Sequence, residues 1–331
     1  MDVPAPPGAR VSIVSTFALA TILALQAPRS HIVIVTGLGG EPGYRRALQE
    51  WASGLAAAGR KLGIPDSSIT LLQGDTAGTR ARVANRGNVT EALRALATRS
   101  RPGDVILVFL AGHGSHEGTE SRLNIPGPDL TAAELGTLLR PLADRRVVVV
   151  NASSASGDFV PALSARGRVI ITATKTSMER NATQFGRHFT AALAQEGADA
   201  DKDGRVSVLE AFLYAKRETA RAYTTDNRLL TEHAMLDDDG DRTGSAAPGA
   251  EGADGALARS VFLGEGTTAP APTDSAGAAL VSEKRALEAR IADLRGRKSS
   301  MKPDEYEAQL EGLLVELALK NEALRGRGAR R

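Results

Sequence analysis

Short apolar runs alternate with longer segments of helical periodicity along most of the chain. Each run holds four to seven residues, rich in Val, Ile and Leu, as is typical of strands buried on both faces. The runs are His31–Thr36, Ile69–Leu72, Asp104–Leu110, Arg146–Val150 and Arg168–Thr172. Their strict alternation with helical segments predicts an α/β fold, with a mostly parallel sheet covered on both faces.

The segments between the runs predict helices over Tyr44–Leu62, Asn88–Ala97 and Thr131–Leu142. Thr131 with Glu134 three residues later is the pattern of a capping box, in which each side chain satisfies a backbone N–H of the other residue. In sheets of this kind functional residues gather on the loops at the carboxyl ends of the strands. The residues that follow each apolar run are therefore the first candidates for a site.

The first 27 residues have the pattern of a signal peptide. Val11–Leu25 holds 15 residues without a charge, which is shorter than a membrane span of about 20 apolar residues. We expect an exported protein, periplasmic or extracellular, whose membrane contact is limited to this segment if it stays uncleaved as an anchor.

The C-terminal part of the chain differs from the α/β pattern. Residues 264–278 are small, proline-bearing and nearly uncharged, which predicts a linker after a main domain over 31–263. Residues 279–326 then carry apolar side chains at coiled-coil spacing, at Leu280, Leu287, Ile291 and Leu294 and again at Tyr306, Leu310, Leu313 and Leu317. Pro303 at the start of the second stretch favours a helical hairpin, which could serve self-association or contact with a partner.

Composition narrows the function classes. The chain has no cysteine, which excludes disulfides, thiolate metal sites and a cysteine nucleophile. Its net charge of +2 comes from the last 53 residues, where 12 Lys and Arg oppose 9 Asp and Glu, so the rest of the chain has a net charge of −1. With only 4% aromatic residues as well, the main domain is not expected to bind nucleic acid.

Two of the apolar runs end in motifs that could carry chemistry. The third run continues into Gly112-His113-Gly114, and the fourth, about 40 residues later, into Ser154-Ala155-Ser156-Gly157. A strand ending in His-Gly followed by one ending in Cys-x-Ser-Gly resembles the legumain (asparaginyl endopeptidase) and caspase-like cysteine peptidases. The resemblance covers about residues 31–264 and suggests a bacterial-type exported member of that family.

The resemblance implies a caspase-like α/β/α sandwich and assigns roles to individual residues. It places the catalytic histidine on His113, the glycine that follows it on Gly114 and the nucleophile on Ser154, where the family has cysteine. A serine hydroxyl ionises far less readily than a thiol and depends on a base in direct contact with it.

Three interpretations of the function follow from this substitution. The protein could be a catalytically impaired homologue that binds a peptide or protein partner, an active serine-type hydrolase using Ser154 and His113, or a calcium-stabilised scaffold. Whether the protein is an enzyme is therefore left open by the sequence. The substrate preference of the cleft is left open too.

A second motif, residues 199–210, matches a 12-residue EF-hand calcium loop. Acidic residues stand at positions 1, 3 and 5, glycine at position 6 and glutamate at position 12. The expected calcium ligands are the carboxylates of Asp199, Asp201 and Asp203, the backbone carbonyl of Arg205, a water held by Ser207, and bidentate Glu210. An acidic solvated loop between two helices is the alternative. Helices are predicted on both sides, over Phe185–Gln195 and Val208–Tyr223.

Asp237–Asp241 resembles part of such a loop. Arg242 follows the acids and no glutamate closes the segment. It is either a weaker second cation site or a solvated acidic turn.

Overall fold

The computed structural model describes residues 28–328 apart from 78, 80, 119, 195, 250–253, 265–275, 277–278, 281–282, 285, 288–289, 292–293 and 295–300. The expected signal peptide or anchor, residues 1–27, lies outside the described residues, as does most of the expected linker, 264–278. None of the described helices is both long and apolar enough to cross a membrane.

The centre of the molecule is a seven-stranded sheet with the strand order β10-β9-β8-β4-β1-β2-β3. All neighbouring strands pair in parallel except β10, which runs antiparallel to β9 at one edge. The strands are β1 (Ser30–Thr36), β2 (Ile69–Gln73), β3 (Arg82–Val83), β4 (Val105–Ala111), β8 (Arg146–Asn151), β9 (Arg168–Thr172) and β10 (Met235–Asp237). The five strands expected from the apolar runs are all present, to within one residue at each end.

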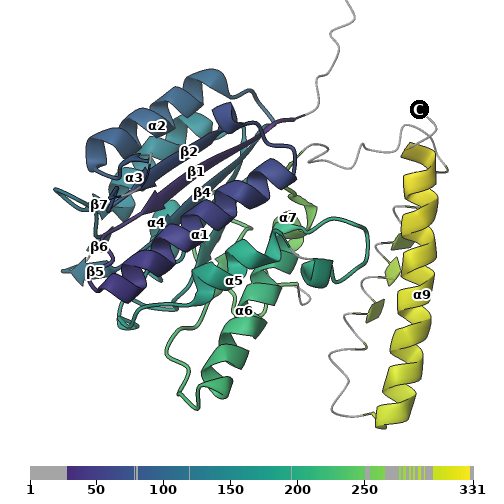
Figure 1. The fold of residues 1–331 in the computed structure, drawn as a ribbon. Coiled ribbons are helices and arrows are strands. Elements are labelled where there is room, and N and C mark those ends of the chain that lie inside the picture. The colour runs from purple at the N-terminus through teal and green to yellow at the C-terminus, as the bar shows by residue number, and fades with distance from the viewer. Residues whose placement is uncertain are drawn as a thin grey trace, which may run out of the picture.

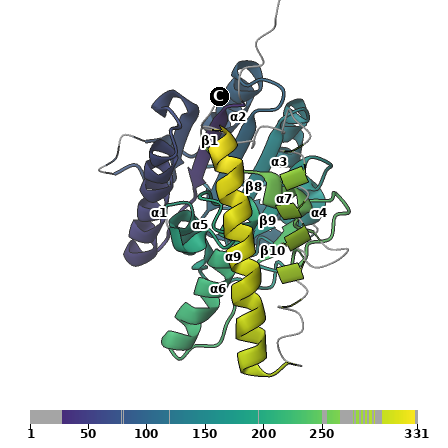
Figure 2. The same cartoon turned by 90° about the vertical axis from the view of Figure 1, so that its right-hand side faces the viewer.

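Helices cover both faces of the sheet, as Figure 2 shows with α1 and α5 on one side and α3 and α4 on the other. One face carries α1 (Pro42–Lys61), α5 (Phe185–Ala192) and α6 (Val208–Thr225), and the other carries α2 (Arg86–Arg99), α3 (Ala132–Leu139) and α4 (Phe159–Leu163). Alternate residues of each strand enter opposite cores, because successive strand side chains point to opposite faces. The expected α/β/α sandwich with a mostly parallel sheet is therefore confirmed.

A small antiparallel sheet follows β4 and was not expected. It consists of β5 (Gly114–Glu117), β6 (Glu120–Leu123) and β7 (Leu130–Thr131) and lies at the left of Figure 1, beyond the carboxyl ends of β1 and β4. These strands hold two to four residues each, too few for an alternating pattern to stand out. The expected capping box at the start of α3 is present, with Thr131 and Glu134 each bonded to the backbone N–H of the other.

The remaining elements lie toward the other end of the sheet. They are the short 3₁₀ helices η1 (Asp66–Ser68), η2 (Arg140–Leu142) and η3 (Glu196–Ala198), and the α-helices α7 (Ala256–Ser260) and α9 (Pro303–Gly328). The described residues between 279 and 294 are helical and pack against α9. The buried residues of this contact are Leu287, Ile291, Leu294, Tyr306, Leu313 and Leu317. Figure 1 shows α9 standing beside α7, opposite the small sheet.

Candidate functional site

The two motifs that follow β4 and β8 meet at the carboxyl end of the sheet. The two strands are neighbours, with Leu110 opposite Asn151. The Ser154 N–H donates to the Gly112 carbonyl oxygen at 3.3 Å, so the two loops lie side by side. The sheet order alone brings these residues together, because adjacent parallel strands end at the same edge.

Ser154 makes its side-chain contact with the other loop. The Gly114 N–H donates to Ser154 Oγ at 3.1 Å. A Cβ atom at Gly114 would lie 2.2 Å from the Ser154 carbonyl oxygen, so only glycine fits beside the serine. Ser154 is buried, at 1% exposure.

His113 is held by an aromatic neighbour that the sequence did not indicate. Its ring lies 4.9 Å from that of Tyr44, centroid to centroid, and Tyr44 OH donates to the Gly112 carbonyl oxygen at 3.2 Å. Burial raises the pKa of Tyr44 to about 12, so the phenol stays protonated and keeps donating. A Cβ atom at Gly40 would lie 3.8 Å from His113 Nε2, which places the loop after β1 on the rim of this site.

The turn after Ser154 is strained and tightly bonded. Ala155 has a φ of 51°, a left-handed conformation that costs a non-glycine residue about 1–3 kcal/mol. Its N–H donates to the Glu179 carbonyl oxygen at 2.8 Å. The Ser156 Oγ and Thr174 Oγ1 lie 3.0 Å apart, and the Gly157 N–H also donates to Thr174 Oγ1 at 3.0 Å. Ser156 and Gly157 thus build the turn rather than face a ligand.

The carboxyl-end site therefore brings the loops of His113 and Ser154 together without a hydrogen bond between these two side chains among the described residues. Within the described part of the chain no hydrogen bond joins Ser154 Oγ to His113, and the contact of the His113 ring is with Tyr44. A serine needs a base in hydrogen-bond reach to become a nucleophile. A backbone N–H beside Oγ would instead stabilise a negative charge already present there, as on a thiolate.

The acidic loop before α6 gathers three carboxylates. Oxygens of Asp199, Asp201 and Asp203 all lie within 4.8 Å of one another. The Gly204 N–H donates to Asp199 Oδ2 at 2.8 Å, and the Arg205 N–H donates to Asp203 Oδ1 at 2.9 Å. Gly204 has a φ of 86°, the left-handed conformation that the sharp turn requires of position 6.

The other expected ligand residues of the loop have different partners. Glu210 Oε1 accepts from the Ala200 and Asp201 N–H groups, and its Oε2 accepts from the Ser207 N–H and hydroxyl at 2.8 Å. Glu210 and Ser207 also form the capping box of α6. The Arg205 guanidinium lies over the Phe262 ring, 4.0 Å from its centroid. Glu210 therefore ties the loop to the helix and stands outside the group of three carboxylates.

Burial sets the electrostatics of this loop. It raises the pKa of Asp199, and the charges of Asp201 and Asp203 add to the effect. Burial likewise raises the pKa of Glu210. Both shifts mean that the ionised carboxylates repel one another in a partly desolvated place, which a bound cation would relieve.

The C-terminal hairpin touches the same loop. Lys284 Nζ lies 3.3 Å from Asp201 Oδ2 and 3.2 Å from Asp203 Oδ2. Asn321 Nδ2 donates to the Asp201 carbonyl oxygen at 2.9 Å. The ammonium group of Lys284 therefore lies against two of the three carboxylates of the loop.

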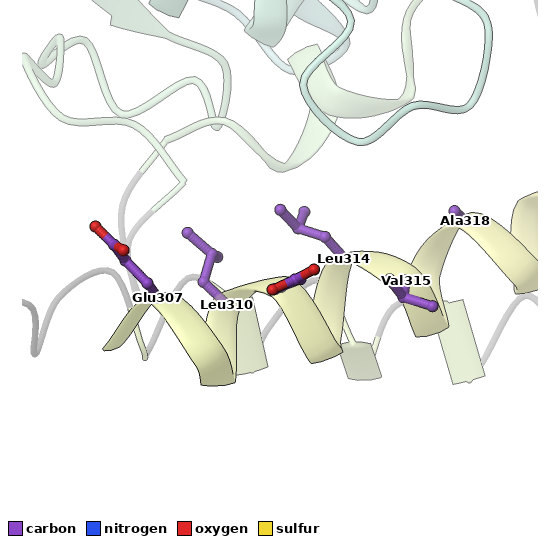
Figure 3. A pocket seen from close by; sticks show the side chains of 6 residues that line it. Glu307, Leu310, Leu314, Val315 and Ala318 are labelled. Carbon is purple, nitrogen blue, oxygen red and sulfur yellow. The ribbon is translucent and has the colours of Figure 1, made fainter. Parts of the chain in front are cut away.

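One side of α9 carries a shallow groove, at residues far along the chain from His113. Figure 3 shows five of its six lining residues with labels, and the full set is Glu307, Leu310, Glu311, Leu314, Val315 and Ala318. Val315 and Leu319 are more than half exposed on this helix. Leu317, one of the seam residues, is instead buried inside the hairpin.

Comparison with known proteins identifies one family. The model of the Peptidase C13 family matches residues 60–232, slightly more than half of the chain, which include His113, Ser154 and the loop 199–210. None of the curated proteins matches the sequence.

Solved structures with a similar fold are distant. A protein from Geobacter sulfurreducens is 15% identical, with a TM-score of 0.45, over 63% of this chain and 93% of its own. The Drosophila initiator caspase Dronc is 11% identical, with a TM-score of 0.42, over 74% and 94% of the two chains. The structure of drICE is also 11% identical, with a TM-score of 0.39, over 64% and 87%.

Proposed function

Since the chain belongs to the Peptidase C13 family, we propose that it is a catalytically impaired peptidase homologue whose cleft binds a peptide or protein partner. One observation carries the proposal: the position expected for the nucleophile holds a buried serine whose Oγ accepts the Gly114 N–H. Among the described residues no base is hydrogen-bonded to this hydroxyl, so we expect its attack on a peptide carbonyl to be slower by orders of magnitude.

The close packing of the residues around His113 and Ser154 supports a binding role. Tyr44 fixes His113, and the glycines at 114 and 157 fit where any side chain would collide with backbone. Two apolar side chains on loops at the carboxyl end of the sheet are open to solvent, Leu38 at 45% and Met178 at 73% exposure. Exposed apolar side chains at the mouth of a site suit contact with a peptide chain.

A fluorophosphonate probe applied to the full chain tests the loss of catalysis. The wild type should label no more than the Ser154→Ala variant. Labelling that disappears in both Ser154→Ala and His113→Ala would contradict the proposal and establish the alternative, a serine-type hydrolase that uses these two residues. Peptide binding is tested separately, by fluorescence anisotropy with a pool of labelled peptides. The Ser154→Ala and His113→Ala variants should still bind this pool.

The second proposal is that residues 199–210 bind calcium and stabilise the fold. The observation in its favour is the cluster of three carboxylates, with the turn at Gly204 that an EF-hand loop requires. The ligands would be Asp199, Asp201, Asp203, the Arg205 carbonyl oxygen, a water on Ser207, and Glu210 after it turns from its present backbone partners. Equal melting curves in calcium and in chelator would contradict the proposal.

The hairpin belongs to this second proposal. Because Lys284 occupies the face of Asp201 and Asp203, calcium would have to displace its ammonium group. We propose that the hairpin is the assembly device of the protein, contacting a second copy or a partner through the exposed face of α9. The molar mass in solution, divided by the mass of one chain, gives the number of copies in the assembly. If a chain truncated near Gly264 has the same number of copies as the full chain, self-association through the hairpin is contradicted.

The place of action is also a proposal. The N-terminal pattern favours export to the periplasm or the extracellular space. An EF-hand loop in that setting commonly serves stability, since extracellular sites bind calcium with dissociation constants of about 10⁻⁴–10⁻³ M. Fractionation of cells that express the full chain would test this assignment.

A further inference from the structure

A second group of carboxylates forms where β10 ends. Oxygens of Asp237, Asp239 and Asp254 lie within 4.8 Å of one another. Asp237 is the last residue of β10 and pairs with Ile170 in β9, while Asp254 stands just before α7. The strand and the helix thus meet at the amino end of the sheet, outside residues 60–232 of the family match.

Asp237 supplies an independent sign that a ligand is missing. The residue is 1% exposed, and its Oδ2 has no hydrogen-bond partner among the described residues. Its Oδ1 accepts from the Gly240 N–H at 3.1 Å. Burial raises the pKa of Asp237, and the nearby Ser164 hydroxyl offsets this only in part, without hydrogen-bonding geometry to Oδ2. An unpaired buried carboxylate oxygen is costly, so this atom calls for a cation or a proton.

The group is held in place by backbone contacts that need no cation. Asp254 Oδ1 accepts from the Asp238 N–H at 2.9 Å. Asp238 in turn accepts from the Gly255 N–H at 2.8 Å and the Ala258 N–H at 2.7 Å. The segment after β10 and the segment before α7 are therefore clamped together by Asp238, which leaves the other three carboxylates facing one another.

Charge accumulates in this place without compensation. In the described part of the chain, no basic side chain forms an ion pair with any of the three carboxylates. The nearest along the chain, Arg242, directs its Nε to the Pro161 carbonyl oxygen at 3.1 Å. Burial, together with the charges of Asp239, Asp237 and Asp238, raises the pKa of Asp254 to about 6.

We propose that Asp237, Asp239 and Asp254 form a second site for a hard divalent cation, calcium by preference. The donors are all oxygen, which suits calcium or magnesium rather than zinc or copper. Calcium is favoured over magnesium because carboxylates fixed by a protein frame seldom meet the strict octahedral geometry that magnesium demands. The cation joins the edge strand β10 to α7 and gives Asp237 Oδ2 its missing partner.

The test counts calcium ions on the full chain after chelator treatment, by equilibrium dialysis against radioactive CaCl₂. We use an Asp201→Asn, Asp203→Asn background, which impairs the loop 199–210 and leaves this group untouched. That background should retain one calcium ion per chain. The ion should be lost, or bound at least tenfold more weakly, when Asp239→Asn or Asp254→Asn is added.

The variants are chosen so that folding does not decide the outcome. Asp239 is exposed, and asparagine at 254 keeps an oxygen for the Asp238 N–H. Asp241→Asn is the matched control, because that carboxylate lies outside the group and its amide oxygen can still accept from the Thr243 N–H. It should leave the calcium count unchanged.

Two results would overturn the second site. One is a loop background that binds no calcium at all. The other is residual binding that Asp239→Asn leaves intact, or that Asp241→Asn abolishes equally. Failure of the loop proposal would look different, because the unmodified chain would then bind one ion that is insensitive to the loop substitutions and sensitive to Asp239→Asn.

Discussion

At the carboxyl end of the sheet the hydroxyl groups of Ser154, Ser156 and Thr174 are all hydrogen-bonded, whereas at the amino end three carboxylates face one another in each of two separate groups. All three side chains are buried. Ser154 Oγ accepts the Gly114 N–H of the neighbouring loop, and Ser156 bonds to Thr174 in the loop after β9. Asp237 and Asp254 are also buried, at 1% and 6% exposure, yet one oxygen of Asp237 has no hydrogen-bond partner among the described residues. Among the described residues, the unpaired carboxylate charge therefore lies at the opposite end of the sheet from His113 and Ser154.

The two ends also differ in what touches them. The carboxyl end is bordered by the loop after β1 and by the small sheet β5–β7, elements of the main domain. The amino end meets the C-terminal hairpin through Lys284 and Asn321. The proposed binding of calcium by the loop 199–210 would therefore compete with a hairpin contact at the amino end and lie apart from His113 and Ser154 at the carboxyl end.

The largest effect is expected from Ser154→Cys, which adds the only thiol of the chain. A thiolate in this place can accept the Gly114 N–H, so its pKa should lie below the usual value of about 8.5. Alkylation by iodoacetamide, followed by mass spectrometry over a pH series, should go from none in the wild type to stoichiometric in the variant. The midpoint of the rate profile should be lower in the native chain than in urea.

His113→Ala in the Ser154→Cys background is the control for this experiment. If the imidazole contributes to the lowered pKa, the midpoint should move back toward that of the unfolded thiol. A native thiol that alkylates with the same midpoint as in urea would mean that neither Gly114 nor His113 activates this position. The carboxyl end of the sheet would then show no activation of a nucleophile, like the amino end.

The next effect is expected from calcium on thermal stability. A ligand at ten times its dissociation constant adds about 1.4 kcal/mol to the native state, which raises the melting midpoint of a domain of this size by about 3–6 °C. Glu210→Gln should remove the contribution of the loop 199–210 but keep the capping box, since glutamine also serves at this position. Scanning calorimetry in calcium and in chelator measures both shifts, and a variant that responds to calcium as fully as the wild type would contradict the role of Glu210.

A smaller effect is expected from Lys284→Met. Its ammonium group competes with calcium for Asp201 and Asp203, so its removal should strengthen calcium binding by the loop about two- to fivefold, as partly exposed ion pairs contribute up to about 1 kcal/mol. Titration calorimetry gives the dissociation constant. Lys320→Met is the matched control, because Lys320 pairs with Glu283 inside the hairpin. An equal change in both variants would mean that the hairpin does not compete with the cation.

The smallest effect concerns pH and Glu232, near the carboxyl end. Both of its oxygens accept backbone N–H groups at the start of α5, and burial raises its pKa above the usual value. A raised pKa in the folded state stabilises the protein below the unfolded pKa of about 4.3, and this contribution is lost as pH rises through the folded value. Because glutamine does not ionise, the free energy of unfolding of Glu232→Gln should rise relative to that of the wild type as the pH is raised from acidic to neutral. Denaturant midpoints over a pH series measure this difference. A difference that does not change with pH would contradict this.

The elements of the main domain could be predicted from the sequence because their signals are local. Five buried strands show as apolar runs, and the capping box at Thr131 needs only residues three positions apart. The small sheet β5–β7 could not be predicted, since its strands hold only two to four residues each, too few for an alternating pattern to stand out. Val315 and Leu317 are two positions apart on one helix, yet only the packing of the hairpin decides that the second is buried.

From the sequence alone one can read that His113 and Ser154 each follow an apolar strand, and that a loop of 12 residues contains the acidic pattern of a calcium site. Which strands are neighbours and which side chains meet depends on the tertiary structure. Tyr44 against His113, Gly114 on Ser154 Oγ, Lys284 on Asp203 and Asp254 beside Asp237 join residues 17 to 81 positions apart. The reason is physical: periodicity and motifs record interactions between near neighbours, whereas contacts at such separations depend on the order of the strands and on the packing of whole elements.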